Sequence, residues 1–193
     1  KPYDGAIEGE SAEIKLNIAG VNDLPTIDQL SQLTIDEEKT TFLKLNASDP
    51  EQNTISYKAF SQISEIDTEI KSDTLVMTPK ENYTGESIIT VSAHDNISVS
   101  GDTTTFKLIV NNINDAPVIA EIEDDNVDED SMEKNVMLSA SDVDSKDLIF
   151  FVSNDTNEVN AFITGNKLTY KPIADFFGNT VLQVSVSDSL LFD

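Results

Sequence analysis

The stretch Thr74–Asp95, TLVMTPKENYTGESIITVSAHD, sets the architecture of this chain because it recurs as Lys167–Asp188, KLTYKPIADFFGNTVLQVSVSD. The two copies begin 93 residues apart in a chain of 193 residues. Both end in alternating apolar and polar residues, the pattern of a half-buried β-strand. A module of about 92 residues therefore occurs twice. The apolar and glycine positions that coincide are Leu75/Leu168, Pro79/Pro172, Tyr83/Phe176 and Gly85/Gly178.

Acidic motifs recur at the same places in both modules. The segment GVNDLPTI, which contains Asp23, returns 92 residues later as INDAPVI, which contains Asp115. Two further acidic segments return in the same way, DEEKT (36–40) as DEDSM (128–132) and ASDPEQN (47–53) as ASDVDSK (140–146). The acids are thus tied to the repeat rather than scattered along the chain.

The module is predicted to be all-β. Period-2 alternation appears in several short runs, each bounded by Asn, Asp, Gly or Pro, and helical spacing finds no sustained match. Several closely spaced strands favour a seven-strand-type antiparallel sandwich, so the chain is predicted to hold two in tandem. Gly85 and Gly178 are expected in turns that need a positive φ, and Tyr83 and Phe176 are assigned to the core rather than to a carbohydrate-binding surface.

The first residues match the end of a module. Ile14, Leu16 and Ile18 align at an offset of 92 with Phe106, Leu108 and Val110. The predicted organisation is residues 1–21 as the orphan last strand of a preceding module, 22–115 as module one, and 116–193 as module two without its last strand. An incomplete sandwich leaves an open edge that a strand from a second molecule could fill. The alternatives are that the orphan strand lies against a neighbour, or that an inserted domain splits module two.

The charge of the chain restricts its partners. Thirty-six acidic residues against 12 basic ones, all Lys, give a net charge of −24. Such a charge opposes contact with phosphates, so nucleic acid is excluded, and no apolar run is long enough to cross a bilayer. The chain contains no Cys, which excludes disulfides and thiolate metal sites. Two explanations of the acids stay open: a solvated acidic surface, or repeated binding of divalent cations.

The sandwich scheme brings the acids together at the joint between the modules. Calcium takes six to eight oxygen ligands, more than a single acidic loop supplies, whereas loops from the end of one module and the start of the next can supply them together. Unoccupied, such a cluster would be self-repelling. The predicted ligands are Glu37, Glu38 and Asn82 from module one, Asn112, Asn114 and Asp115 from the linker, and Asp142, Asp144 and Asp188 from module two.

The motifs NDLP, NDAP, ASDPE, ASDVD, AHD and VSD, with the YxPxxxFxG pattern of YKPIADFFG, resemble those of cadherin-like tandem repeats in bacterial surface proteins, including calcium-dependent RTX adhesins. The resemblance covers nearly the whole chain and implies an Ig/cadherin-like sandwich that holds Ca²⁺ at each linker. It further implies ligands at the upstream joint, Asn22, Asp23, Asp49, Glu51 and Asp95, and at the far end, Glu129, Asp130 and Asp175.

The resemblance implies a calcium-stiffened extender of a large adhesin, extracellular at a bacterial cell surface, that serves adhesion or biofilm formation. Its expected partners are neighbouring repeats of the same protein. The alternative function is a recognition module that binds carbohydrate, peptide or another copy of itself, with Phe150, Phe151 and Phe162 as candidate contacts. Catalysis is not expected, because the single histidine, His94, has Ser187 at the equivalent place in module two.

Overall fold

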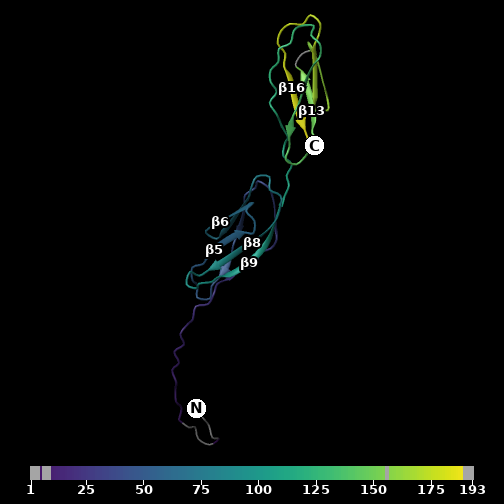
Figure 1. Cartoon of the computed structure of the whole chain (residues 1–193). Coiled ribbons are helices and arrows are strands. Elements are labelled where there is room, and N and C mark those ends of the chain that lie inside the picture. The colour runs from purple at the N-terminus through teal and green to yellow at the C-terminus, as the bar shows by residue number, and fades with distance from the viewer. Residues whose placement is uncertain (1–4, 6–9, 155–156, 189–193) are drawn as a thin grey trace. The chain divides into compact units, whose positions relative to one another are not determined.

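The computed structural model describes residues 5, 10–154 and 157–188, and within them the chain is all-β, as predicted. It divides into two compact units, unit 1 over Lys1–Asn111 and unit 2 over Asn112–Asp193 (Figure 1). Among the described residues no helix is long and apolar enough to span a membrane.

Unit 1 is a sandwich of a four-stranded and a three-stranded sheet. The larger sheet has the order β2-β9-β8-β5 and the smaller one β3-β7-β6, while β1 and β4 form a short separate pair. Within the larger sheet β2 runs parallel to β9, with Leu33 opposite Leu108, and the other pairs are antiparallel. The strands are β1 (Thr26–Ile27), β2 (Leu33–Asp36), β3 (Thr41–Lys44), β4 (Ala47–Ser48), β5 (Ser56–Ser61), β6 (Ile66–Lys71), β7 (Thr74–Pro79), β8 (Gly85–His94) and β9 (Asp102–Asn111).

The core of unit 1 lies between these sheets. Alternate residues of β8 and β9 face inward, which confirms the predicted period of two, and β7 contributes the fully buried Leu75 and Met77. Burying a large apolar side chain contributes about 1.5–3 kcal/mol, so this row of inward residues stabilises the unit. Members from β8 and β9 are Ile89, Val91, Ala93, Phe106, Leu108 and Val110.

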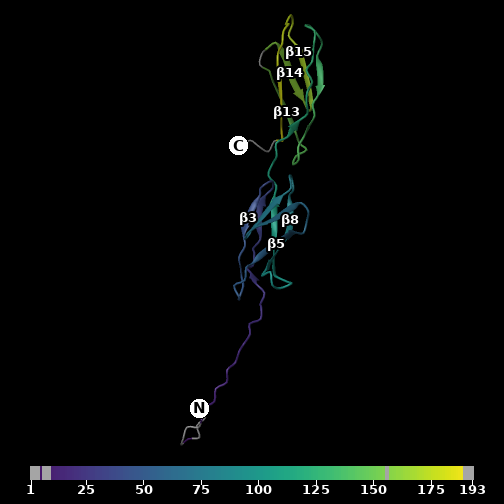
Figure 2. The same cartoon turned by 90° about the vertical axis from the view of Figure 1, so that its left-hand side faces the viewer.

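Unit 2 repeats most of this arrangement. A three-stranded sheet has the order β11-β15-β14, β13 pairs with β16, and β10 pairs with β12 (Figure 2). The strands are β10 (Val118–Ile119), β11 (Lys134–Met137), β12 (Ala140–Ser141), β13 (Ile149–Asn154), β14 (Val159–Thr164), β15 (Lys167–Pro172) and β16 (Leu182–Ser187). Its buried apolar core is smaller and consists of Leu138, Val159, Leu168 and Tyr170.

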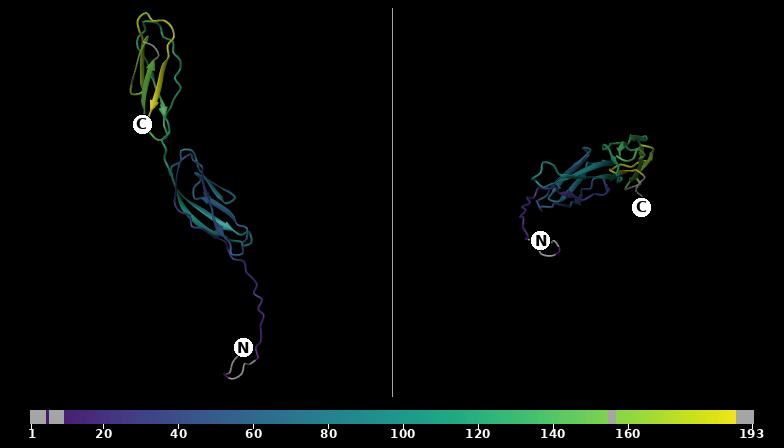
Figure 3. Two further views of the ribbon diagram at one scale, coloured as in Figure 1. Left: turned by 180° about the vertical axis from the view of Figure 1, so that it is seen from behind. Right: turned by 90° about the horizontal axis from the view of Figure 1, so that it is seen from below.

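The segment predicted as an orphan strand carries no strand over residues 10–25, and residues 1–4 and 6–9 lie outside the described residues. Its apolar side chains Ile14, Leu16 and Ile18 are 82%, 75% and 88% exposed. Figure 3 shows the segment, in purple, running extended ahead of the strands of unit 1. A strand needs a partner for its backbone hydrogen bonds, and this segment has no partner strand within the described part of the chain.

Repeated backbone geometry accompanies the repeated sequence. Gly85 and Gly178 have φ of 141° and 143°, which confirms the positive φ predicted for both turns. At Gly85 a Cβ atom would also lie 2.9 Å from the hydroxyl oxygen of Tyr83. The acidic turns repeat as well, since the left-handed residues Glu38 and Asn82 of unit 1 correspond to Asp130 and Asp175 of unit 2.

Candidate functional site

Asn22 joins three loops at one end of unit 1. Its side-chain Nδ2 donates to Asp95 Oδ2 at 2.7 Å and to Ser98 Oγ at 2.9 Å, and its Oδ1 accepts from Asn53 Nδ2 at 2.9 Å. The loops meet here because β1 and β4 are antiparallel, which places the start of β1 beside the end of β4. Pro25 lies just before β1, where its missing N–H costs no ladder bond, and it is fully buried.

The loop after β4 folds around the carboxylate of Asp49. Asp49 Oδ1 accepts from the backbone N–H of Glu51 at 3.0 Å and of Asn53 at 2.9 Å, a turn that Asp favours. Glu51 Oε2 in turn accepts from the backbone N–H of Asp23 at 3.1 Å, so the loop holds the linker. The other oxygen, Asp49 Oδ2, is buried and has no hydrogen-bond partner.

Asp95 is the buried acid of this cluster and is only 3% exposed. Its Oδ1 accepts from the backbone N–H groups of Ile97 and Ser98, at 2.9 and 2.8 Å, and its Oδ2 accepts from Asn22 and Ser98. The hydrogen bond from Asn22, followed by those from Ser98 and Ile97, holds the pKa of Asp95 well below its usual range. Asp95 is therefore charged at neutral pH despite its burial.

Unit 2 repeats this arrangement around Asn114. Asn114 Nδ2 donates to Asp188 Oδ2 at 2.6 Å, and Asp144 Oδ2 accepts from the backbone N–H of Asp115 at 2.7 Å. Asp142 Oδ1 accepts from the N–H groups of Asp144 and Ser145, at 2.8 and 2.5 Å. Asp188 is 4% exposed, like its counterpart Asp95. Five predicted residues thus come together in each unit: Asn22, Asp49, Glu51 and Asp95 with the backbone N–H of Asp23 in unit 1, and Asn114, Asp142, Asp144 and Asp188 with the backbone N–H of Asp115 in unit 2.

The two clusters differ at the position of Asn53. Asn53, which donates to Asn22 in unit 1, has the exposed Lys146 as its counterpart. As a result Asn114 Oδ1 is buried without a hydrogen-bond partner, as is Asp142 Oδ2. Sequence reasoning missed Asn53 and Ser98 as members of the unit 1 cluster. The signal at Asn53 was weak because the repeat does not preserve it.

The remaining predicted ligands lie at the other turns. The backbone N–H of Glu37 donates to the carbonyl of Asn111 at 3.0 Å, and Glu38 and Asn82 occupy left-handed turns. In unit 2 the N–H of Asp175 donates to Asp130 Oδ1 at 3.3 Å, while Glu129 lies in an exposed turn. Asn112 is exposed. That Glu37, Glu38, Asn82 and Asn112 add ligands to the second cluster stays a prediction.

The chemistry of both clusters suits a hard cation. Their donors are all oxygen, which calcium prefers, and each contains a buried carboxylate oxygen that receives no hydrogen bond. In the described ranges no three His, Asp or Glu side chains are grouped closely enough to hold a metal ion. In each cluster an Asn side-chain amide donates its N–H to the buried carboxylate. The chemistry of the donors fits calcium, and the side-chain amides would have to turn to admit it.

The aromatic candidates for recognition are divided between core and surface. Phe150 packs against the core of unit 2, whereas Phe151 and Phe162 are 47% and 50% exposed. Tyr83 packs against the core of unit 1, as assigned from the sequence. His94 Nε2 lies 3.0 Å from Ser92 Oγ, while the adjacent Asp95 carboxylate accepts from the loop that follows it. Asp95 thus serves the loop rather than orienting the His94 ring.

A family comparison gives the relationship of these units. The model of the bacterial Ig domain matches residues 22–110 and again residues 114–190. The chain belongs to the bacterial Ig domain family. This assignment shows tandem bacterial Ig-like modules, a coarser relationship than the cadherin-like RTX adhesin type expected from the motifs.

Solved structures similar to the two Ig domains share little sequence with them. An endo-fucoidan hydrolase of glycoside hydrolase family 107 is 18% identical over 91% of this chain and 28% of its own, with a TM-score of 0.41. The titin domains Z1Z2 in complex with telethonin are 11% identical over 86% of this chain and 95% of their own, with a TM-score of 0.35. The Ig domains thus span less than a third of that hydrolase. No curated protein matches the chain.

Proposed function

We propose that these Ig domains form a calcium-binding extender of a large bacterial cell-surface adhesin, located outside the cell and serving adhesion or biofilm formation. The observation that carries the proposal is the repeated cluster at the start of each domain, in which the preceding linker is tied to acidic loops. A buried carboxylate oxygen without a partner, on Asp49 or Asp142, supports a cation in each. The proposed role is mechanical and not catalytic.

The chemistry of domain two favours a cation most strongly. Asn114 donates a hydrogen bond from its neutral NH₂ group to the carboxylate of the buried Asp188. Turning this amide by 180° would present Oδ1 beside the carboxylate, an arrangement that a cation between the two oxygens would stabilise. Asp142 Oδ2 and Asp144 would add further oxygens. A bound calcium ion supplies the charge that offsets the repulsion among these acids.

A cation in the cluster would join the linker to the loops of its domain. Asn114 and Asp115 belong to the linker, whereas Asp144 and Asp188 belong to loops of domain two. A cation held by both groups would fix the direction in which the linker leaves its domain. The same arrangement at Asn22 and Asp23 would fix the linker ahead of domain one, so a chain of such domains would stiffen as calcium rises.

Calcium titration tests the proposal. We expect heat of binding in calorimetry and, at a calcium concentration one hundred times the dissociation constant, a stabilisation of about 2.7 kcal/mol. For domains of this size that corresponds to a rise of about 10 °C or more in melting temperature. Melting curves that coincide in EDTA and in millimolar calcium would contradict the proposal.

Matched variants locate the binding. Asp142→Asn removes an acid with an unpartnered oxygen and should abolish binding in domain two while leaving that in domain one. Asp147→Asn, an exposed acid of the same loop, removes the same charge outside the cluster and should leave both binding events intact. Equal weakening by both variants would indicate a diffuse effect of surface charge.

A further inference from the structure

The two clusters hold the same number of acids. Each has one acid in the linker, two in the loop after β4 or β12, and one directly after β8 or β16. These acids are Asp23, Asp49, Glu51 and Asp95 in unit 1 and Asp115, Asp142, Asp144 and Asp188 in unit 2. A difference in calcium affinity between the clusters must therefore come from the groups that surround the acids.

In unit 1 both ends of the Asn22 amide are hydrogen-bonded. Nδ2 donates to the carbonyl of Asp23 at 3.0 Å, to Asp95 Oδ2 at 2.7 Å and to Ser98 Oγ at 2.9 Å. Oδ1 accepts from Asn53 Nδ2 at 2.9 Å. The orientation of the amide follows from these contacts, because the opposite one would direct Oδ1 at the carboxylate of Asp95 and Nδ2 at the NH₂ group of Asn53.

In unit 2 only one end of the equivalent amide is hydrogen-bonded. Asn114 Nδ2 donates to the carbonyl of Asp115 at 3.1 Å and to Asp188 Oδ2 at 2.6 Å. Its Oδ1 is buried and accepts no hydrogen bond within the described part of the chain. The counterpart of Asn53 is Lys146, whose side chain is exposed. A buried acceptor without a donor is unfavourable, so the metal-free arrangement of unit 2 is the less stable of the two.

Turning the amide has a different cost in the two clusters. A cation beside the buried carboxylate requires the Asn oxygen to face it, as argued above for domain two. In unit 1 this turn breaks the hydrogen bonds to Asp95 and Ser98 and also the one from Asn53. In unit 2 it breaks the bond from Asn114 to Asp188 and gives Asn114 Oδ1 the partner that it lacks. The turn is therefore more favourable in unit 2.

We propose that Asn53 holds the amide of Asn22 in the orientation that excludes a cation, so that unit 2 binds calcium at a lower concentration than unit 1. This inference rests on the calcium binding proposed above and adds which linker responds first. The linker ahead of domain one is held by the amide of Asn53 without metal, whereas the linker ahead of domain two is fixed by calcium. Two additional hydrogen bonds to break correspond to a dissociation constant about tenfold higher in unit 1.

Removing the amide of Asn53 tests this assignment. Asn53→Ala leaves Asn22 Oδ1 without its donor, which reproduces the arrangement at Asn114. The variant is made in a full chain that carries Asp142→Asn, which confines calcium binding to domain one. In calorimetry we expect its dissociation constant to fall about tenfold, while the melting temperature of unit 1 in EDTA also falls. A merely structural role of Asn53 would lower that melting temperature without tightening the binding of calcium.

The reverse exchange in unit 2 gives an independent test. Lys146→Asn supplies the amide that unit 2 lacks, in a chain that carries Asp49→Asn to confine binding to domain two. Lys146→Ala is the matched control, because it removes the same charge without supplying an amide. We expect calcium to bind more weakly to the Lys146→Asn chain than to the control.

The outcomes separate this inference from the function on which it rests. An unmodified chain that shows no heat of calcium binding would contradict the proposed function itself. Two calcium sites of equal affinity, or binding to domain one that Asn53→Ala leaves unchanged or weakens, would overturn the role of Asn53 alone. Equal dissociation constants for Lys146→Asn and Lys146→Ala would also contradict it.

Discussion

Asp95 and Asp188 show how single residues hold the linker of each domain. Each carboxylate is nearly inaccessible, and each accepts from the amide of an asparagine in the preceding linker. A charged group is stable in such a place only where several hydrogen bonds reach it. The chain therefore uses the same acid, at the end of equivalent strands, to capture the linker of both domains.

At Asp95 the direction of the pKa shift predicts sensitivity to acid. Since the folded pKa is lowered from 3.8, the stability that this group contributes is present above pH 3.8 and is lost as the pH falls further. Asp95→Asn should lower the melting temperature of unit 1 at pH 7 and flatten its dependence on pH below 4. Thermal unfolding monitored by circular dichroism between pH 2 and 7 measures both effects. An unchanged acid profile would contradict the argument.

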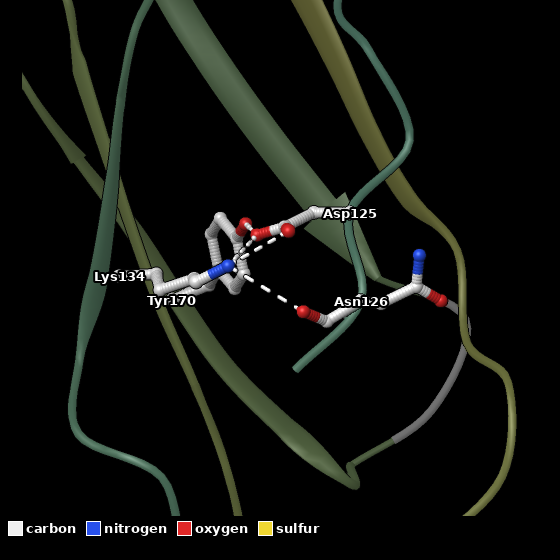
Figure 4. A network of polar contacts seen from close by, with 4 residues as sticks. All are labelled: Asp125, Asn126, Lys134 and Tyr170. Atoms are coloured by element: carbon white, nitrogen blue, oxygen red, sulfur yellow. Dashed lines mark hydrogen bonds and ion pairs between the residues drawn. The ribbon is translucent and has the colours of Figure 1, made fainter. Parts of the chain in front are cut away.

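At Tyr170 the shift predicts sensitivity to base. Burial, together with the hydrogen bond to Asp125 shown in Figure 4, raises the pKa of Tyr170 from 10 to about 12. The neutral phenol is favoured in the folded state, so the contribution of Tyr170 to folding stability is complete below pH 10 and is lost as the pH rises from 10 to 12. The free energy of unfolding in urea should therefore fall between pH 9 and pH 11, and Tyr170→Phe should reduce this fall by the part that Tyr170 causes. A titration of tyrosine absorbance gives the pKa directly.

At Gly85 a side chain is opposed by both the backbone and a neighbour. A φ of 141° is strained for an L-residue, and the added Cβ would lie 2.9 Å from the Tyr83 hydroxyl oxygen. We expect Gly85→Ala to destabilise unit 1 by roughly 1–3 kcal/mol in urea unfolding. Combining it with Tyr83→Phe should recover only the part due to the hydroxyl contact, which separates the two causes.

At the scale of elements, the equivalent strands β8 and β16 differ in length. Gly85–Ala93 pair with β9, whereas the strand in unit 2 begins only at Leu182. Hydrogen exchange should therefore be slow over residues 85–93, which are paired with β9, and faster over residues 178–179, which lie outside any strand. Equal protection of both stretches would contradict the argument.

At the scale of the whole molecule, two unequal cores predict two unfolding transitions. Unit 1 buries its apolar row between complete sheets, whereas the core of unit 2 opens on a groove. Calorimetry should resolve two transitions, one for the less stable unit 2 and one for the more stable unit 1. Leu108→Ala should lower the stability of unit 1 by about 2–5 kcal/mol, whereas Leu168→Ala should affect only the transition of unit 2. A single transition shifted by both variants would show coupled domains.

Much of the fold followed from local patterns. The alternation in β8 and β9 and the positive φ at Gly85 and Gly178 were predicted because they depend on neighbours within the same strand or turn. The repeat also located the acids of both clusters, since equivalent residues of two copies of one fold occupy equivalent places. The role of Asn53 was not predicted, because its hydrogen bond to Asn22 joins residues 31 apart in sequence and is absent from the second copy.

Period and repeat spacing were enough to establish an all-β chain of two related modules, because alternation reflects which face of a strand meets the core. They could not establish which acids lack a hydrogen-bond donor, or that β16 starts four residues late. Those features depend on groups distant in sequence: Asp142 Oδ2 receives no hydrogen bond from its loop, and β16 begins only at Leu182, where it pairs with Asn154 of β13. Hydrogen-bond satisfaction is a property of folded neighbours, and only folding brings those neighbours together.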